Sequence, residues 1–376
     1  MSLVLKLAGL IKSIDRKVWP DHRVAISPDI AQTLRQHNLI VADVGSADGP
    51  EEIWLSLKQF IHFLTFEPNP RSAKPTDETN VTNFPIGLWS EKGRKTLYLT
   101  NHPDSASLLP INQPLFADYM VHKGMELAGA TQIDLDTLDH LLAGKPELSP
   151  DFLKIDVEGA ELDVLKGSQA ALARSILGLR VETAFLELHL GAPLLWDIDV
   201  FLRERGFVLF HLGRNYFIRN NGLHGHTSEP QLIWGDAVYF LGREALLKRL
   251  AALNQEHQKA ALAKFVVILV RHGVHDYAWD IVEAARAAGR IPREFADSLQ
   301  ALVKNSMDTS AWYFVKAVFG VVFALLILVA SCPLAEPRKR AVYYVKQRVG
   351  RLGYALSRWA ALQGRIPNSF LGDPFV

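Results

Sequence analysis

A chain of 376 residues is long enough for a catalytic domain with an extension, and it can bury a sizeable core. The formal net charge of +1 and the 22% share of charged residues exclude a nucleic-acid binder driven by bulk charge, and also a disordered chain. The single cysteine, Cys332, excludes an internal disulfide framework and a cysteine-based zinc site.

Residues 1–37 precede the first expected strand. Their stretch MSLVLKLAGLIKSIDRKVW has apolar residues at helical spacing with lysines between them, and no small-residue cleavage site follows a long apolar core. We therefore expect a helical lead-in with a short amphipathic helix, and not a signal peptide.

Residues 38–241 alternate short apolar runs with helical patterns at the spacing of βα units, which predicts a mainly parallel sheet. A polar loop, and not an apolar helix, joins the last two runs, so we expect these two to form an antiparallel edge pair. The pattern predicts an α/β, doubly wound, Rossmann-like fold with a seven-stranded, mostly parallel sheet. The expected strands are 39–45, 63–68, 84–89, 152–159, 179–189, 206–212 and 236–241.

The chain beyond residue 241 has the pattern of an all-α C-terminal extension. Residues 242–310 combine helical spacing with turn signals at HGVHD and AAGRIP, which predicts a helical module of a few short antiparallel helices. Residues 311–332 include a run of about twenty residues in which only Lys316 is charged. At a rise of about 1.5 Å per residue, this run is long enough to cross a bilayer core of about 30 Å. We expect an apolar membrane-associated helix, with a buried helix of the module as the alternative.

Residues 333–376 form a basic tail. Its stretch 338–365 has no acidic residue, and apolar side chains within 341–363 recur at steps of three and four. Such a helix suits an anionic membrane surface, and a partner-binding or coiled-coil helix is the alternative. A true span would place these basic residues outside, against the positive-inside rule, whereas an interfacial helix would not. We expect single-pass or monotopic attachment to the cytoplasmic face of a membrane, through 311–332 and also through 341–363.

The first chemical motif is VADVGSADG, an apolar strand that ends near Asp43 and is followed by Gly45 and Gly49. Glycines in such a turn let the backbone approach a bound nucleotide closely, although tight turns need glycine in any case. The motif lacks the G-x-G-x-x-G spacing of dinucleotide enzymes and the G-K-[ST] of phosphate-binding loops. Dehydrogenases and nucleoside triphosphatases are therefore disfavoured.

Acidic residues follow two further expected strands. Glu67 ends FLTFEPNP, and a carboxylate at the end of a second strand can accept hydrogen bonds from both hydroxyls of an adenosine ribose. In FLKIDVEGAELDVLKG, Asp156 ends a buried strand and Glu158 lies on the following turn. Glu161 near the helix start has a structural explanation in the helix dipole. Because ligands bind at the carboxyl edge of open α/β sheets, Asp156 is a candidate functional residue.

The motifs DVGSADG, FEPNP, IGLWSEKGRKTLYLTNHPDSASLLP and KIDVEGAELDVLKG, in this order, resemble those of the FkbM family of methyltransferases. The resemblance covers roughly residues 38–241. It implies a class I methyltransferase sheet, S-adenosyl-L-methionine as the methyl donor, and a hydroxyl acceptor that is often on a sugar or a natural product.

The resemblance also implies roles for individual residues. Asp43, Gly45 and Gly49 would border the methionine part of the cofactor, and Glu67 would bind the ribose. Ser46 stands where the family commonly has alanine, so a contact to the cofactor is altered there. The full set of expected cofactor contacts is Asp43, Gly45, Ser46, Gly49, Glu67 and, at the adenine edge, Gly87, Leu88 and Trp89.

Methyl transfer to oxygen is a direct displacement that needs an aligned hydroxyl and a base to take its proton. The expected catalytic residues are Asp156, Glu158 and His189, and the histidine has a suitable pKa near neutrality. His224 and His226 lie in a loop, where histidines are usually solvated. No metal site is expected, because acids at metal-ligand spacing do not accompany these histidines.

Two hypotheses follow for function. The first is an O-methyltransferase acting on a saccharide, a lipid-linked glycan or a similar small molecule, with no nucleic-acid partner. The second is a non-catalytic module that binds S-adenosylmethionine or a glycan and recruits partners through its helical tail. The presence of all four acids, Asp43, Glu67, Asp156 and Glu158, favours the enzyme.

Overall fold

The structure is a computed structural model in which Val24–Val303 form one compact unit that contains every predicted site residue. The predicted membrane-associated helix 311–332 and the basic tail lie outside the described residues, so both stay predictions. In the part of the chain that the structure describes, no helix combines the length and apolar character needed to cross a membrane. The described residues are 24–46, 49, 51–69, 78–102, 105–121, 123–220 and 231–307.

The main sheet, as far as the described residues show it, has eight strands in the order β10-β11-β8-β7-β1-β2-β3, with β9 also paired to β11. The five strands β1, β2, β3, β7 and β8 are parallel, whereas β11 is antiparallel to its neighbours. The predicted α/β fold and the antiparallel edge pair are thus confirmed, and the short strand β10 is additional. The strands are β1 Leu39–Val44, β2 Ile61–Phe66, β3 Val81–Phe84, β7 Phe152–Ile155, β8 Gly178–Ala184, β9 Phe207–Leu212, β10 Asn215–Phe217 and β11 Gln231–Leu241.

Both faces of the main sheet are covered, as expected for parallel strands. Phe152 and Leu153 point to opposite faces of β7, and both are fully buried. On the Phe152 face, the rings of Trp54 and His272 pack against Phe152. The helices of this region are η1 Glu52–Phe60, α4 Leu138–Leu141, η2 Pro146–Leu148, α5 Glu161–Lys166, α6 Gln169–Arg174 and α7 Leu195–Arg203.

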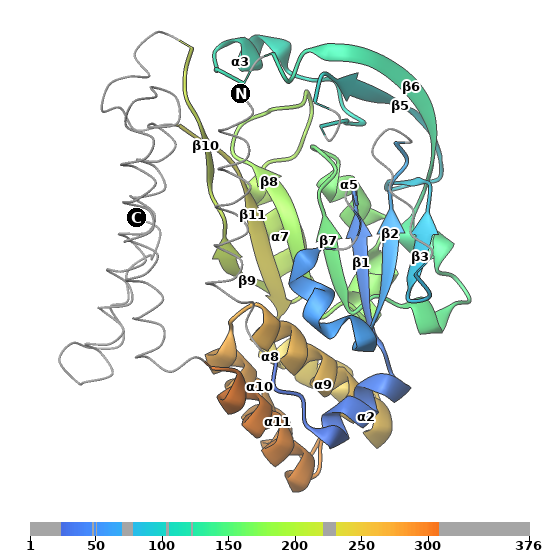
Figure 1. Ribbon diagram of the computed structural model, residues 1–376, viewed down its shortest axis with the longest axis vertical. Helices are drawn as coiled ribbons and strands as arrows, with labels where there is room; N and C mark the ends of the chain where they lie inside the picture. The colour runs from blue at the N-terminus through green and yellow to red at the C-terminus, as the bar shows by residue number, and fades with distance from the viewer. Residues whose placement is uncertain are drawn as a thin grey trace, which may run out of the picture. The chain divides into compact units, whose positions relative to one another are not determined.

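A second, smaller sheet interrupts the βα pattern after β3. Within the described residues it has three strands, β4 Gly87–Leu88, β5 Gly93–Thr100 and β6 Leu127–Asp136, in the order β4-β6-β5. These strands arch over the carboxyl ends of the main sheet and carry α3, Gln113–Ala117, at their far end (Figure 1). The run expected as one strand at 84–89 is therefore split, because Pro85 ends β3 and Gly87 begins pairing with β6.

The helices after β11 are part of the main core. The longest of them is α9, Gln255–Arg271, where the successive residues 265–270 are all buried, so this helix is enclosed rather than amphipathic. It contacts α2, Pro28–Gln36, which precedes β1. The predicted helical module is present, although α9 is longer than the short helices expected. Its other helices are α8 Arg243–Ala251, α10 His275–Ala287 and α11 Arg293–Ser306.

Candidate functional site

The predicted cofactor residues of the first two strands gather at the carboxyl edge of the sheet. Asp43 is the penultimate residue of β1 and is 2% exposed, and Glu67 directly follows β2. Gly45 and Gly49 have positive φ angles of 81° and 83°. Ser46 between them is buried, and its Oγ has no hydrogen-bond partner among the described residues. A buried hydroxyl of this kind is a natural contact for a polar ligand.

Gly45 lies where two strand ends meet. A Cβ added to it would lie 1.8 Å from the backbone oxygen of Asp156, so no side chain fits. Its N–H donates to the carbonyl of Phe66 at the end of β2. The turn after β1 is therefore pressed against the turn after β7, which brings the glycine turn next to a predicted catalytic residue.

A row of polar side chains crosses the sheet just below this edge. The cross-strand register pairs Asp43 with Thr65 on one side and with Lys154 on the other, and pairs Lys154 with Arg180. Thr65 donates from Oγ1 to Oδ1 of Asn83 over 2.7 Å. Aligned residues on neighbouring strands point to the same face, so the row forms one continuous polar strip.

Lys154 contacts the acidic residues of this strip. Its Nζ lies 3.1 Å from Oδ1 of Asp43 and 3.4 Å from Oδ2 of Asp156, and it donates to the carbonyl of Gly45 over 3.0 Å. Burial raises the pKa of Asp43, although Lys154 opposes this shift. Burial alone would lower the pKa of Lys154, but the carboxylates of Asp43 and Asp156 outweigh it and raise that pKa. A charged lysine thus bridges the ends of β1 and β7.

The turn after β7 has a strained and tightly held backbone. Glu158 has a positive φ of 56°, which costs a residue with a Cβ about 1 kcal/mol or more. The carboxylate of Glu161 accepts the N–H groups of Val157 and Gly159 at 3.2 and 3.0 Å, and Ser107 donates from Oγ to the carbonyl of Glu158 at 2.6 Å. Burial raises the pKa of Glu161 to about 7. Glu161 therefore organises its own turn through these hydrogen bonds, whereas the explanation expected from the sequence was the helix dipole.

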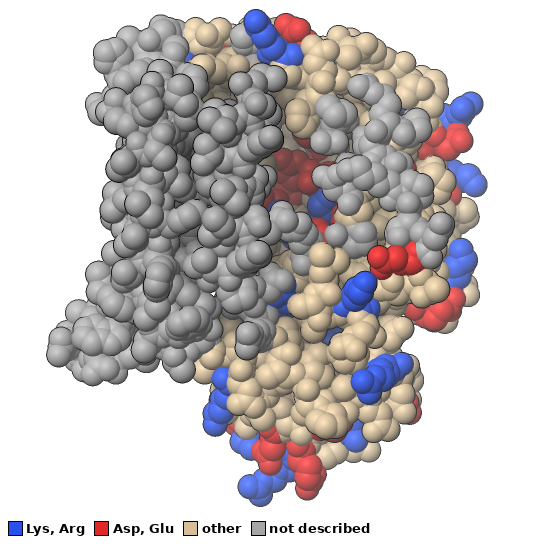
Figure 2. All heavy atoms as spheres, in the orientation of Figure 1, with Lys and Arg blue, Asp and Glu red and all other residues tan. Residues whose placement is uncertain are grey.

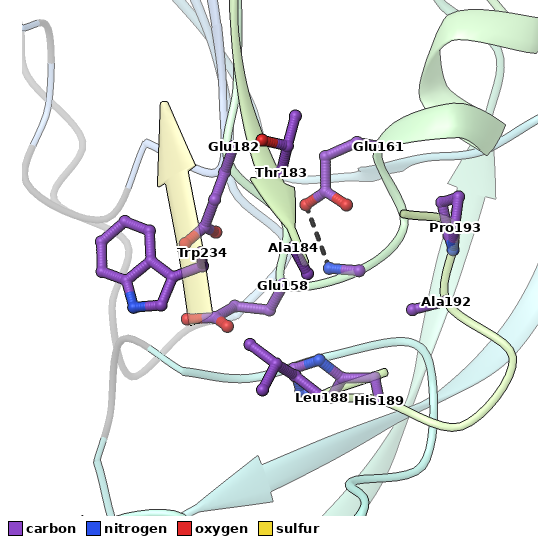
Figure 3. A pocket seen from close by; sticks show the side chains of 11 residues that line it. Glu158, Glu161, Glu182, Thr183, Ala184, Leu188, His189, Ala192, Pro193 and Trp234 are labelled. Carbon is purple, nitrogen blue, oxygen red and sulfur yellow. Dashed lines mark hydrogen bonds between the residues drawn. The ribbon is translucent and has the colours of Figure 1, made fainter. Parts of the chain in front are cut away.

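A small hollow lies beside this turn. It is lined by Glu158, Glu182 at the end of β8, Trp234 of β11 and the predicted residue His189. The carboxyl groups of Glu158 and Glu182 point toward the same space next to the indole, whereas Glu161 turns to the backbone amide (Figure 3). Acidic side chains gather at the bottom of a hollow on this side of the described surface (Figure 2).

Two carboxyl groups of this region are in contact. The carboxyl of Glu182 hydrogen bonds that of Asp156, and burial together with the charges of Asp156 and Glu158 raises the pKa of Glu182 well above its ordinary value. Two carboxylates in contact cannot both ionise easily, so the neighbouring Asp156 disfavours the charged form of Glu182. Among the described residues, no three His, Cys, Asp or Glu side chains are placed to hold a metal ion.

His189 is 2% exposed, and its Nε2 has no hydrogen-bond partner among the described residues. Burial lowers the pKa of His189 to about 4, so the pKa near neutrality expected from the sequence is wrong. The imidazole is therefore neutral at physiological pH, and an unpartnered ring nitrogen faces a buried environment.

The low pKa of His189 makes stability depend on pH. An unfolded histidine takes up its proton near pH 6.5, so below this pH the unfolded chain binds more protons than the folded one. Above pH 6.5 this group does not lower the free energy of unfolding. As the pH drops to about 4, the free energy of unfolding falls by about 3 kcal/mol. Urea unfolding of His189→Gln and of the unchanged protein at pH 7 and pH 4.5 should show a smaller acid loss in the variant.

The raised pKa of Glu161 changes folding stability with pH in the opposite direction. The protonated Glu161 stabilises the fold at low pH, and this contribution is lost as the pH rises from 4.5 to 7. The comparison between the two proteins cancels this effect, since both contain Glu161. His102→Gln, at an exposed histidine, is the matched control for removal of one imidazole. Equal acid losses in His189→Gln and in the unchanged protein would contradict the prediction.

The predicted adenine residues have packing roles. Leu88 is buried in the main core, and Trp89 lies in a small core with Leu97 and Ile133, with the ammonium of Lys95 4.5 Å from its ring centre. A Cβ on Gly87 would lie 2.5 Å from the side chain of Leu135. Their contact with an adenine ring stays a prediction.

The predicted residues Asp43, Gly45, Glu67 and Asp156 thus share one sheet edge, and His189 lies beside its acidic end. His224 and His226 lie outside the described residues. Three polar residues of this site, Lys154, Glu182 and Ser107, were not predicted from the sequence, although a signal existed for two of them. Lys154 and Glu182 are charged residues that alternate with apolar ones in expected strands, which indicates a polar face near the strand ends. Ser107 carried no such signal.

The known proteins to which this chain is similar are methyltransferases. Residues 43–209 match the family model described as the methyltransferase FkbM domain. Methyltransferase sdnD of Sordaria araneosa is 30% identical over 196 residues, which cover 45% of this chain and 73% of that protein. The crystal structure of methyltransferase FkbM from Methylobacillus flagellatus KT matches at 16% identity with a TM-score of 0.30, over 54% of this chain and 44% of that one. The match thus spans less than half of the crystallised protein.

Proposed function

Because this chain belongs to the FkbM family of methyltransferases, we propose that it transfers the methyl group of S-adenosylmethionine to a hydroxyl group. The acceptor that we propose is a saccharide, a lipid-linked glycan or a similar small molecule. The observation that carries the proposal is the contact between the glycine turn at Gly45 and the backbone of Asp156, which puts a cofactor-type turn beside an acidic pocket.

The residues at the edge fit this cofactor. The carboxylate of Glu67 can accept both ribose hydroxyls, and the buried hydroxyl of Ser46 can contact the methionine part. At Gly49 no described atom lies within 4 Å of the side-chain position, which leaves the backbone open to a close ligand. When bound, S-adenosylmethionine supplies an electrophilic methyl group on a sulfonium centre.

The proton of the acceptor hydroxyl needs a base, and we assign this role first to Nε2 of His189. This role requires the neutral tautomer whose proton is on Nδ1, because only then does Nε2 have a free lone pair; His189 lines the same hollow as Glu158. Glu158 is the alternative base. Asp156 is less suited, because it is already hydrogen bonded to the carboxyl of Glu182 and contacts Lys154.

Calorimetric titration with S-adenosylhomocysteine tests the cofactor site. Glu67→Gln removes a charged acceptor of the ribose hydroxyls, so binding should weaken by about tenfold to a hundredfold, the equivalent of about 1.5–3 kcal/mol for such hydrogen bonds. Glu147→Gln, at an exposed carboxylate of η2, should bind as the unchanged protein does. Absence of binding by the unchanged protein, or equal affinities in all three, would refute the proposal.

A further inference from the structure

Each end of the glycine turn after β1 contacts a cation on another strand. At the near end, Lys154 of β7 donates to the carbonyl of Gly45 over 3.0 Å and pairs with Asp43. At the far end, Glu51 directly precedes η1, and its carboxylate accepts a hydrogen bond from Nη1 of Arg180 in β8. Lys154 and Arg180 are partners in the register of β7 and β8, so the two cations lie side by side on one face of the sheet.

The ion pair between Arg180 and Glu51 is partly shielded from water. The side chain of Glu51 is 16% exposed and that of Arg180 is 35% exposed. Burial raises the pKa of Glu51, and the charge of Arg180 opposes this shift. A carboxylate that has lost much of its hydration depends on the cation beside it, so Glu51 is stable in this position because Arg180 is there.

Arg180 is fixed from its other side by Asp236 of β11. The Nε and Nη2 atoms of Arg180 lie 3.2 and 3.1 Å from Oδ1 of Asp236. The strands that carry these two residues, β8 and β11, pair along the whole of β8. Because a guanidinium is planar, contacts at Nε and Nη2 also set the direction of Nη1, which donates to Glu51. The main sheet thus determines where the far end of the turn lies.

The turn between these two ends depends on them for its shape. At Gly49 no described atom lies within 4 Å of the side-chain position, so no packed side chain fixes the backbone there. Glycine also has more conformational freedom than any other residue. A turn whose ends are fixed before a ligand arrives loses less conformational entropy on binding than a loose one, and therefore binds more tightly.

From these contacts we infer that Arg180 is a positioning residue for the cofactor, because it fixes the far end of the glycine turn through Glu51. Lys154 has the matching contact at the near end. Arg180 acts through its ion pair with Glu51 and not through contact with the cofactor. The effect on S-adenosylmethionine rests on the proposed methyltransferase function, whereas the order of the turn can be measured without any ligand.

Two substitutions of Glu51 in the full-length protein test this role. Hydrogen exchange of the segment 44–57, followed by mass spectrometry without ligand, measures the order of the turn, and calorimetric titration measures S-adenosylhomocysteine affinity. Glu51→Met removes the acceptor of Nη1, so exchange should become about tenfold faster and affinity should fall at least about fivefold. Glu51→Gln keeps an acceptor oxygen, and both quantities should stay within about threefold of the unchanged protein.

A double variant tests whether Arg180 acts through Glu51. Arg180→Met should loosen the turn about as much as Glu51→Met does. The variant that combines both changes should be no looser than either single variant, because both changes remove the same contact. Asp236→Asn keeps an acceptor oxygen for Nε and Nη2, so it should change exchange and affinity by less than about threefold.

The matched control is Glu283→Met, which removes the acid of another arginine pair, with Arg286 in α10. It should leave the exchange of 44–57 and the affinity for S-adenosylhomocysteine unchanged. Exchange of α9 in the same samples provides an internal reference, because a general loss of stability would accelerate exchange there as well.

Four results would overturn the role of the ion pair: unchanged exchange in Glu51→Met, an equal effect of Asp236→Asn, additive effects in the double variant, or equally accelerated exchange in α9. A looser turn with unchanged S-adenosylhomocysteine affinity would overturn its role in cofactor binding. If the unchanged protein does not bind S-adenosylhomocysteine, the proposed function fails, and the exchange data still decide whether Arg180 fixes the turn.

Discussion

Gly45→Ala is expected to prevent correct folding of the carboxyl edge and to abolish S-adenosylhomocysteine binding. The new Cβ would lie 1.8 Å from the carbonyl oxygen of Asp156, and the φ of 81° is itself unfavourable for alanine. Since backbone on both sides must move, we expect a loss of more than about 3 kcal/mol, beyond the usual range for one substitution. Thermal unfolding and calorimetric titration of the variant measure both effects.

Gly49→Ala is the matched control. Its φ of 83° is nearly the same, but no described atom lies within 4 Å of the added Cβ. It should therefore cost only the strain of the left-handed conformation, about 1–2 kcal/mol, and keep cofactor affinity within a few-fold. If the two alanine variants proved equally stable, the close approach of the turns after β1 and β7 would be wrong.

Lys154→Met should destabilise the protein by about 3–5 kcal/mol, the usual cost of removing one partner of a buried ion pair. The change leaves Asp43 and Asp156 facing each other without their shared cation, and it removes the donor to the carbonyl of Gly45. Because Lys154 holds the glycine turn in place through these contacts, the affinity for S-adenosylhomocysteine should fall by at least about tenfold. Urea unfolding and calorimetry at low temperature measure the two quantities on folded protein.

Lys264→Met separates stability from site geometry. Lys264 pairs over 2.9 Å with Asp151, a buried carboxylate that also accepts the N–H of Ile40 at the start of β1. This pair lies at the amino ends of the strands, away from the glycine turn. We expect a similar loss of stability with unchanged cofactor affinity. Equal effects of Lys154→Met and Lys264→Met on affinity would show that Lys154 acts on stability alone.

The parallel core of this fold is predictable from sequence because its strands are short apolar runs. LIVADV and FLKI are buried along their whole length, and the polar loop before β11 correctly indicates antiparallel pairing. The strands of the small sheet have a weaker alternation of apolar and polar residues in the sequence. Most residues of β6 in its first half are exposed, and those of β5 alternate poorly, since this sheet lies over the edge and buries little.

The acids of the site follow from their positions at strand ends, since parallel strands bring their carboxyl ends to one edge. The partners of those acids do not follow in the same way. Lys154 meets Asp43 only because β1 and β7 pair in one particular register, and Ser107 reaches Glu158 only because the small sheet folds back over the edge. Both contacts join distant parts of the chain, which periodicity within one segment does not specify.

The enclosure of α9 affects how such chains can be recombined. Residues before β1 pack against this helix: α2 contacts it, and His37 pairs with Glu256 over 3.0 Å. A gene fusion or an exchange between relatives that joins new sequence at residue 242 would therefore cut through the hydrophobic interior. Val24 to Val303 must be inherited, swapped or engineered as a single piece, even though the match to the family model ends at residue 209.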